Sequence, residues 1–210
     1  GMRLAHRQPV MTVSAVFIAA AVALTIVAPV IGIPDPTEID VTQMKMAPGK
    51  SHLLGTDRLG RDMLSRVIHG GRISLRVAFF GVLAGTVVGG VWGLLSGYAG
   101  GKTDAINQRL VEIVLSIPGL LLAFVLAAIM TPGLNTVILA IAVLNLGQTA
   151  RIIRGVTLSS KQREYVTAAR AIGVRWPRIV IRHVAPNSIA PFLVLFSVQV
   201  GAGIILEATL

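Results

Sequence analysis

The chain has 210 residues, of which 54% are hydrophobic and 13% are charged, and its mean hydropathy is +0.78. Soluble domains carry about 25% charged residues, so this composition excludes an ordinary soluble protein and indicates an all-α polytopic membrane protein. The absence of cysteine excludes disulfide bonds and thiolate chemistry. The formal net charge of +10 is concentrated in residues 151–187, which hold eight Arg or Lys and one Glu. That distribution is typical of a cytoplasmic loop between membrane helices and argues against nucleic acid as a partner.

The N-terminal segment predicts a first membrane helix. Residues 1–9 contain Arg3 and Arg7, and residues 10–33 are uncharged. A secretory signal has an apolar core of only about 7–15 residues, whereas this run is long enough to cross a bilayer. We therefore expect residues 1–9 to be cytoplasmic and residues 10–33 to form a transmembrane helix.

Residues 34–72 are expected to be an external segment with an amphipathic helix. Prolines make its first part irregular, and in its second part Leu59, Met63, Leu64 and Val67 would share one helical face. An interfacial structural role is favoured over substrate contact. The scatter of His and Asp here does not have the spacing of metal ligands, so no metal site is expected. The polar motif of this segment comprises Gly55, Thr56, Asp57, Gly60, Arg61, Asp62, Ser65 and Arg66.

A second span is predicted from Val77 to Gly101, with glycine at every fourth position. Small residues at this spacing form one smooth stripe, against which another helix backbone can pack closely in lipid. Residues 98–109 should then form a turn on the inner side. The stripe consists of Gly81, Gly85, Gly89, Gly93 and Gly97.

Residues 113–150 contain no charge, and as one helix they would be about 57 Å long, nearly twice the thickness of a bilayer core. The sequence Thr131-Pro132-Gly133 is expected to divide them into two spans, with a kink at Pro118 in the first. Asn145 is expected to make an interhelical hydrogen bond.

The basic loop, residues 151–187, is predicted to be a helix–turn–helix. Ser159 and Gln162 have the spacing of a capping box, so a helix should start near Ser160. Gly173 can adopt the left-handed conformation that ends this helix. Pro177 suits the first turn of a second helix, and Pro186 should close the unit before a fifth span over residues 187–206.

These residues resemble the EAA loop of ABC importer permeases. Ala168-Ala169, Gly173 and Pro186 fall at the family spacing, while Thr167, His183 and Ala185 depart from it. The wider string is similar to the second-permease (C-type) branch of the dipeptide, oligopeptide and nickel transport family, as is the polar motif of residues 55–66. The resemblance implies a permease core over residues 73–210, whose ATPase-coupling loop would use Glu164, Ala168, Ala169, Arg170, Gly173, Pro186 and Asn187.

The resemblance also implies partners and a location. These are a second permease subunit in a heterodimer, two ATP-binding subunits, an external substrate-binding protein and the lipid of the bacterial cytoplasmic (inner) membrane. ATP hydrolysis would occur in the partners, so the chain is expected to be neither an enzyme nor a cofactor-binding protein. The branch has a sixth helix, and its absence after residue 210 leads us to expect that the chain is a fragment.

Three alternatives were weighed against a peptide importer. Nickel import within the same family stays open, because both branches share these loops. An intramembrane enzyme would need paired catalytic groups at membrane depth, and no His or Asp lies centrally in a predicted span. A channel or secondary transporter is the third alternative, and the scarcity of intramembrane charge disfavours proton coupling.

Overall fold

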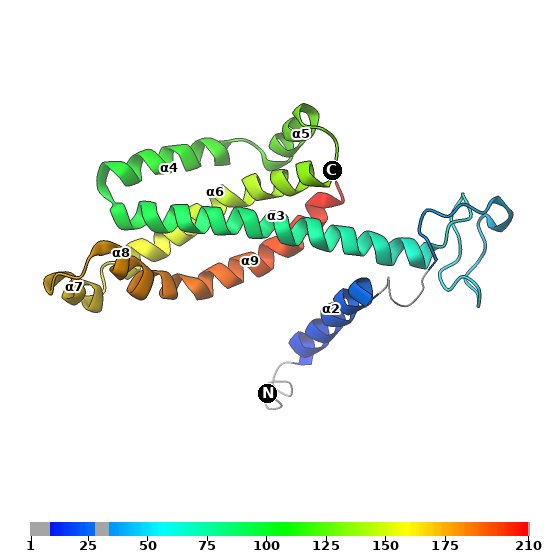
Figure 1. Ribbon diagram of the computed structural model, residues 1–210, viewed down its shortest axis with the longest axis horizontal. Coiled ribbons are helices and arrows are strands. Elements are labelled where there is room, and N and C mark those ends of the chain that lie inside the picture. Colours follow the sequence, from blue (N-terminus) through cyan, green and yellow to red (C-terminus); the bar gives the residue numbers. More distant parts are fainter. Residues whose placement is uncertain (1–8, 28–33, 210) are drawn as a thin grey trace. The chain divides into compact units, whose positions relative to one another are not determined.

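The computed structural model describes residues 9–27 and 34–209, and over these residues it is helical without a β-strand. The chain forms two compact units, Gly1–Arg76 and Val77–Leu210, and the boundary between them falls within one helix. The helices are shown in Figure 1. The prediction of an all-α membrane protein is confirmed: among the described residues three helices are long and apolar enough to span a membrane, or four if one bent pair is counted.

The first unit contains helix α2 (Pro9–Val27), the short η1 (Val41–Gln43) and the first turns of α3 (Met63–Ala99). Helix α2 has 19 residues and covers most of the predicted first span. Residues 28–33 lie outside the described residues, so that span stays a prediction. The expected amphipathic helix is not a separate element, because α3 begins at Met63, where Asp62 accepts a hydrogen bond from the Ser65 N–H (2.7 Å).

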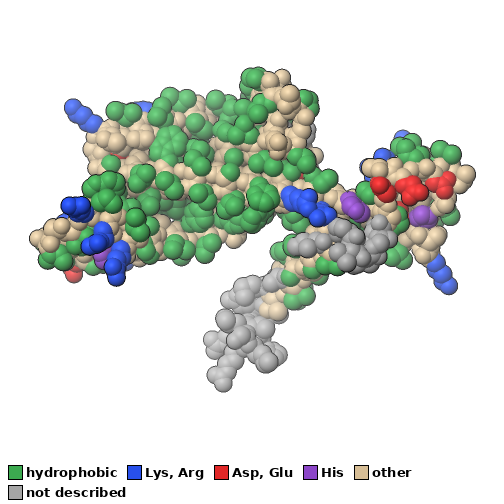
Figure 2. All heavy atoms as spheres, viewed as in Figure 1, with side chains coloured by type: hydrophobic (Ala, Val, Ile, Leu, Met, Phe, Trp, Pro, Cys, Tyr) green, Lys and Arg blue, Asp and Glu red, His purple; other side chains and the backbone are tan. Residues whose placement is uncertain are grey.

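The second unit is a helical bundle built on the C-terminal part of α3. It adds α4 (Gly101–Ser116), α5 (Gly119–Ile129), α6 (Leu134–Ser160) and α7 (Glu164–Ala171). Three consecutive elements complete it, namely α8 (Trp176–Ile179), the π-helix η2 (Val180–Val184) and α9 (Ala185–Glu207). Hydrophobic side chains cover the surface of this bundle in Figure 2, as expected for a protein surrounded by lipid.

Helices α3 and α6 pack backbone to backbone along the glycine stripe. A Cβ placed on Gly81 would lie 2.8 Å from the Ile141 side chain, and one on Gly97 would lie 3.1 Å from the Arg154 carbonyl oxygen. Hence no larger side chain fits along this line without separating the two helices. At the three central positions a Cβ would overlap α6 backbone carbonyls: Gly85 with Ala142, Gly89 with Leu146, and Gly93 with Ala150.

The predicted break at Thr131-Pro132-Gly133 is confirmed, since α5 ends at Ile129 and α6 begins at Leu134. The preceding stretch is not a single kinked span, however. Helices α4 and α5 are bent by 83° at Ile117–Pro118. Proline has no N–H to continue the helix and pushes the residue before it out of the α conformation, and Ile117 is accordingly extended (φ −85°, ψ 125°).

Two other predictions, one about a turn and one about a hydrogen bond, are wrong. Residues 98–109 are not a turn, because Gly100 (φ +69°) and Gly101 (φ +58°) reverse the chain and α4 starts at once. Asn145 makes a hydrogen bond within its own helix, to the Ile141 carbonyl (2.7 Å). The buried polar pair between α6 and α9 is instead Thr149 and Gln199, whose side-chain oxygens lie 3.4 Å apart.

The basic loop is more helical than predicted. Helix α6 continues to Ser160, which is only 2% exposed, and the Ser159 hydroxyl donates back to the Val156 carbonyl (3.3 Å) instead of capping a new helix. Helix α7 therefore begins at Glu164. After the turn, α8, η2 and α9 run on as one helix, Trp176–Glu207.

Pro186 does not end the helix–turn–helix as predicted. It lies in the first turn of α9, directly after η2. In η2 the Ala185 N–H reaches the Val180 carbonyl, five residues back. This wider turn accommodates a proline ring, which would clash with the carbonyl four residues before it in a regular α-helix.

Candidate functional site

The turn between α7 and α8 is built by Gly173. Its φ of +80° is the left-handed conformation predicted for it. The Gly173 N–H donates to the Arg170 carbonyl and the Val174 N–H to the Ala169 carbonyl, both at 3.0 Å. This pair of bonds is the Schellman motif, which satisfies the last carbonyls of a helix when glycine follows it. Pro177 occupies the first turn of α8. We call residues 164–179 the α7–α8 unit.

A small core holds the α7–α8 unit against the end of α3. Val166, Ala169, Ile179 and Val184 are buried together, and Val174, which follows the turn, packs on them. The α3 residues in this core are Leu94 and Tyr98.

Tyr98 is also the centre of an aromatic contact. Its ring stacks on Trp176 with centroids 6.3 Å apart, and the Arg170 guanidinium carbon lies 5.3 Å from its centroid, a cation–π geometry. Thus α7, α8 and α3 are joined through one side chain.

The predicted coupling residues separate into inward and outward positions. Ala169 is 7% exposed and belongs to the core, whereas Glu164, Ala168, Arg170 and Gly173 are exposed. Tyr165 (39%) and Ile172 (80%) are also exposed, so not all apolar side chains of this segment face the core.

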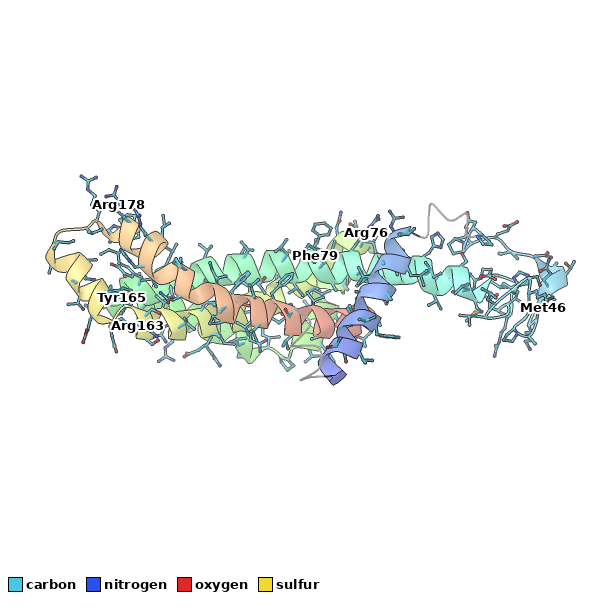
Figure 3. All side chains as sticks on the ribbon, turned by 90° about the horizontal axis from the view of Figure 1, so that it is seen from below. Met46, Arg76, Phe79, Arg163, Tyr165 and Arg178 are labelled. Carbon is cyan, nitrogen blue, oxygen red and sulfur yellow. The ribbon has the colours of Figure 1, made fainter. Side chains whose placement is uncertain are left out.

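Pro186 and Asn187 lie beyond the unit, at the start of α9. The Asn187 amide nitrogen donates to the Tyr165 hydroxyl (3.0 Å) and to the His183 carbonyl (2.6 Å), so it links α9 back to α7. Figure 3 shows Arg163, Tyr165 and Arg178 gathered at this end of the bundle.

A charged cluster, which we call the Asp104 clamp, ties α3, α4 and α6 together close by. Asp104 is 6% exposed and receives two hydrogen bonds from Arg154, Nε to Oδ1 at 2.7 Å and Nη2 to Oδ2 at 2.6 Å. The Ser96 hydroxyl donates to Oδ1 at 2.8 Å. Bidentate pairs of this kind are among the stronger charge-assisted contacts. In addition, Lys161 Nζ donates to the Gly97 carbonyl (2.8 Å), next to the C-terminal end of α3.

The Asp104 clamp was not predicted. Asp104 and Arg154 are 50 residues apart, and a single sequence does not show that they pair. A signal was present, because Asp104 is the first acid after the uncharged residues 77–101, and a carboxylate close to a membrane span usually has a charged partner.

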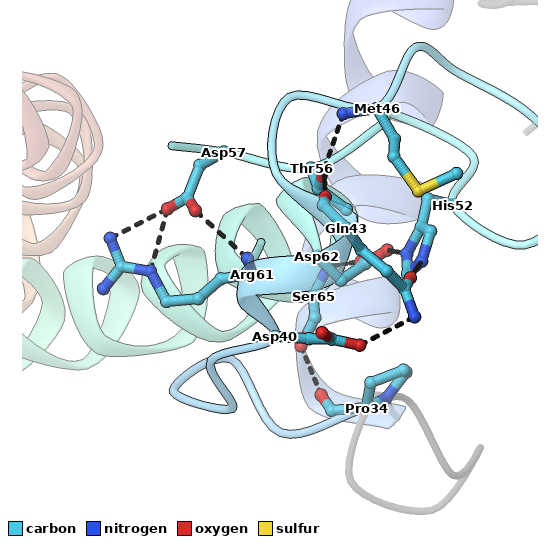
Figure 4. A network of polar contacts seen from close by, with 10 residues as sticks. All are labelled: Pro34, Asp40, Gln43, Met46, His52, Thr56, Asp57, Arg61, Asp62 and Ser65. Carbon is cyan, nitrogen blue, oxygen red and sulfur yellow. Dashed lines mark hydrogen bonds and ion pairs between the residues drawn. The ribbon is translucent and has the colours of Figure 1, made fainter. Parts of the chain in front are cut away.

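In the first unit, the polar motif of residues 55–66 builds a compact loop (Figure 4). Gly55 (φ +73°) and Gly60 (φ +76°) have left-handed backbones, and a Cβ on either would overlap a backbone carbonyl, of Met46 or Asp40 respectively. The Thr56 hydroxyl accepts from the Met46 N–H (2.8 Å) and donates to the Gln43 carbonyl. The Ser65 hydroxyl donates to the Pro34 carbonyl.

The charged residues of this motif pair with one another. Burial alone would raise the pKa of Asp57, but hydrogen bonds from the Leu59 and Arg61 N–H groups and from the Arg61 side chain outweigh it and lower the pKa to about 2. Arg66 also contacts Asp57. Asp62 binds His52 Nδ1 at 2.8 Å. All of these motif side chains are engaged within the loop.

Comparison with known proteins identifies the family. The profile of the family described as "binding-protein-dependent transport system inner membrane component" matches residues 89–210. The chain belongs to this family. The matched region covers the C-terminal part of α3 and all of α4 to α9. It therefore includes the Asp104 clamp, the α7–α8 unit and the last three glycines of the stripe, Gly89, Gly93 and Gly97.

Curated relatives agree with this assignment. The chain is 40% identical over 171 residues to the glutathione transport system permease protein of Pectobacterium atrosepticum, covering 81% of this chain and 57% of the relative. It is 37% identical over 203 residues to the probable D,D-dipeptide transport system permease protein of Escherichia coli K12 (96% and 68%). It is 38% identical over 201 residues to the dipeptide transport system permease protein of Haemophilus influenzae (93% and 68%).

The resemblance inferred from the sequence is therefore confirmed at the level of the family. The chain spans 57–68% of the length of these three relatives. As an inner-membrane component with several apolar helices, it is a multi-pass membrane protein.

Proposed function

We propose that the chain is a permease subunit of an ATP-driven importer for di- or oligopeptides. Family membership and three relatives named for glutathione or dipeptide transport support this substrate class. The permease would form the translocation path together with a second permease subunit. Two ATP-binding subunits would supply the hydrolysis, and an external binding protein would deliver the peptide.

The structural observation that carries the proposal is the α7–α8 unit. It presents exposed residues on one side, including Ala168 and Ile172, while its other side is packed on α3 through Val166 and Ala169. Its second helix continues directly into α9. A force applied to the exposed side would therefore reach two bundle helices, α3 by packing and α9 through the chain itself.

A pair of neighbouring substitutions separates docking from folding. Ala168→Arg places a large, positively charged side chain on the exposed side. The permease should therefore fold but fail to retain the ATP-binding subunits during purification. Ala169→Arg buries that charge in the core beside Val166 and should disrupt the α7–α8 unit itself. Co-purification and uptake of a labelled dipeptide are the measurements. Normal ATPase retention and uptake with Ala168→Arg would refute the proposed coupling surface.

We further propose that the N-terminus and the α7–α8 unit are cytoplasmic, on the basis of the basic residues around α7 and α8. Gln162 is exposed whereas Ser160 is buried, so Gln162→Cys is the suitable probe in this cysteine-free chain. In intact cells it should react with a permeant maleimide and resist an impermeant one. Labelling by the impermeant reagent would reverse the orientation.

A further inference from the structure

An aromatic hollow lies beside the end of α3. It has a volume of about 580 Å³ and is lined by Trp92, Leu95 and Tyr98 on α3, Thr103 and Asn107 on α4, and Trp176 on α8. The chain contains two tryptophans and two tyrosines, so both tryptophans and one tyrosine meet at this one place. Tryptophan and tyrosine concentrate at the boundary between hydrocarbon and water, where an apolar ring can carry a polar group.

The walls of the hollow are held in place by named contacts. The Trp92 indole N–H donates to the Asn107 side-chain oxygen at 2.6 Å. Trp176 stacks on Tyr98, and Arg170 lies over the Tyr98 ring. The hollow therefore has aromatic walls held by specific contacts, and Arg170 lies over one of these aromatic side chains, Tyr98.

The helices that form the hollow are apolar on one side of it. Large side chains of α3 and α4 are exposed next to its lining residues, including Val91 (52%), Leu95 (46%), Ile106 (63%) and Leu110 (49%). Apolar side chains on membrane helices are compatible with contact to acyl chains. An acyl chain that lies along this surface would reach the hollow.

The charge on the other side of the hollow is positive. The α7–α8 unit contributes Arg170, Arg175 and Arg178, against Glu164 as its acid. Among the described residues, none of these arginines takes part in an ion pair. The acid near the hollow, Asp104, is already paired with Arg154. Figure 2 shows basic side chains gathered at this end of the bundle.

We infer that the aromatic hollow is a binding site for a phospholipid with an anionic headgroup. The acyl chain would lie against Leu95 and the two indoles, and the phosphate would lie toward Arg170. Unpaired cations at the membrane surface attract anionic lipids. None of the described residues that line the hollow is acidic, so they offer no carboxylate to the ammonium group of a zwitterionic lipid. This inference does not depend on what the permease transports.

The tryptophans provide the test, since both line the hollow and brominated acyl chains quench indole fluorescence at short range. The purified chain is reconstituted into phosphatidylcholine vesicles with a fixed small fraction of brominated lipid. The headgroup of the brominated lipid is either phosphatidylglycerol or phosphatidylcholine, with identical acyl chains. We expect stronger quenching by the anionic lipid. The variants Trp92→Phe and Trp176→Phe should each retain this preference through the remaining indole.

Substitutions at Arg170 make the test specific. One basic residue near a membrane surface changes the attraction for anionic lipid by about fivefold. Arg170→Gln should therefore reduce the relative affinity for the brominated anionic lipid about fivefold, and Arg170→Lys should largely preserve it. Arg163→Gln is the matched control, because it removes the same charge from an exposed residue of the same segment. Arg170 lies over the ring of Tyr98, which lines the hollow, whereas among the described residues Arg163 has no such ring contact, so its loss should have a smaller effect.

Three results would overturn the inference. Equal quenching by the two headgroups would show that the hollow does not select charge. An equal loss in the Arg163 and Arg170 variants would show only general surface attraction. Indoles that neither brominated lipid quenches would show that a protein segment covers the hollow in place of lipid.

Discussion

Replacement of Gly173 by valine should open the α7–α8 turn. No atom lies within 4 Å of a Cβ built on Gly173, so the added side chain meets no neighbour, and the effect comes from the backbone alone. The φ of +80° is unfavourable for an L-residue by about 1–2 kcal/mol, and β-branching makes it worse. A penalty of about 2 kcal/mol corresponds to about a 30-fold larger population of the open turn.

Hydrogen exchange is the direct assay for this opening. The amide protons of Gly173 and Val174 form the two bonds of the Schellman motif, so their exchange should accelerate about 30-fold in Gly173→Val. When the turn opens, Val174 also leaves the core formed with Val166 and Ala169. In a transporting complex, we expect peptide uptake per ATP hydrolysed to fall while assembly of the bundle persists.

The asparagine variant is the control. Asparagine tolerates the left-handed conformation better than other non-glycine residues, so Gly173→Asn should keep slow exchange and most of the uptake. The reasoning would be refuted if exchange and coupling in Gly173→Val matched those of the original chain. It would also fail if the valine and asparagine variants were equally impaired.

Three further changes test other parts of the structure. Asp104→Asn should destabilise the bundle by about 3 kcal/mol, because it leaves the Arg154 charge without its counterion. Thermal unfolding of the purified chain measures this change. An unchanged stability would show that the Asp104 clamp is dispensable. Gly89→Ala should lower the unfolding temperature, because its Cβ overlaps the α6 backbone. Gly155→Ala has open space around the new Cβ and should be neutral or stabilising by up to about 1 kcal/mol. Equal effects of the two substitutions would contradict the close contact between α3 and α6. The pKa of Asp57 is lowered to about 2 from about 3.9 when unfolded, so its stabilisation of the loop is present above about pH 4 and is lost as the pH falls toward 2. Pepsin cleavage within residues 45–61 should rise over that range, after correction with an unfolded substrate, while flat cleavage would argue against the ionised carboxylate.

The sequence was most informative where a backbone requirement selects one residue type. Gly173 and Pro177 occupy the turn and helix start predicted for them, because left-handed φ and a missing N–H are local properties. The break at residues 131–133 follows from the same local chemistry. Helix periodicity likewise placed the small residues of α3 on one side, although it did not identify α6 as the helix that packs there.

Predictions failed where the outcome depends on surroundings. Pro118 was expected to kink a helix, but with Ile117 extended the chain turns by 83°, and sequence alone does not set that angle. Ser159 and Gln162 have the spacing of a capping box, yet Ser159 lies inside α6, which continues to the buried Ser160. Pro186 has the sequence signature of a helix end, but the wider turn of η2 allows the helix to continue past this proline. The Asp104 clamp and the stacking of Trp176 on Tyr98 join distant segments, and no local pattern encodes such pairs.

The continuity of α8, η2 and α9 has a mechanical consequence. At 1.5 Å per residue, the 32 residues from Trp176 to Glu207 form a rod about 48 Å long. A tilt of about 10° imposed at one end of a rigid rod of that length displaces the other end by about 8 Å. The regular hydrogen-bonding pattern of the rod is weakened at η2 and at Pro191. The bending stiffness at η2 and at Pro191 therefore determines how far the opposite end of α9 moves when the helix is tilted slightly at Trp176.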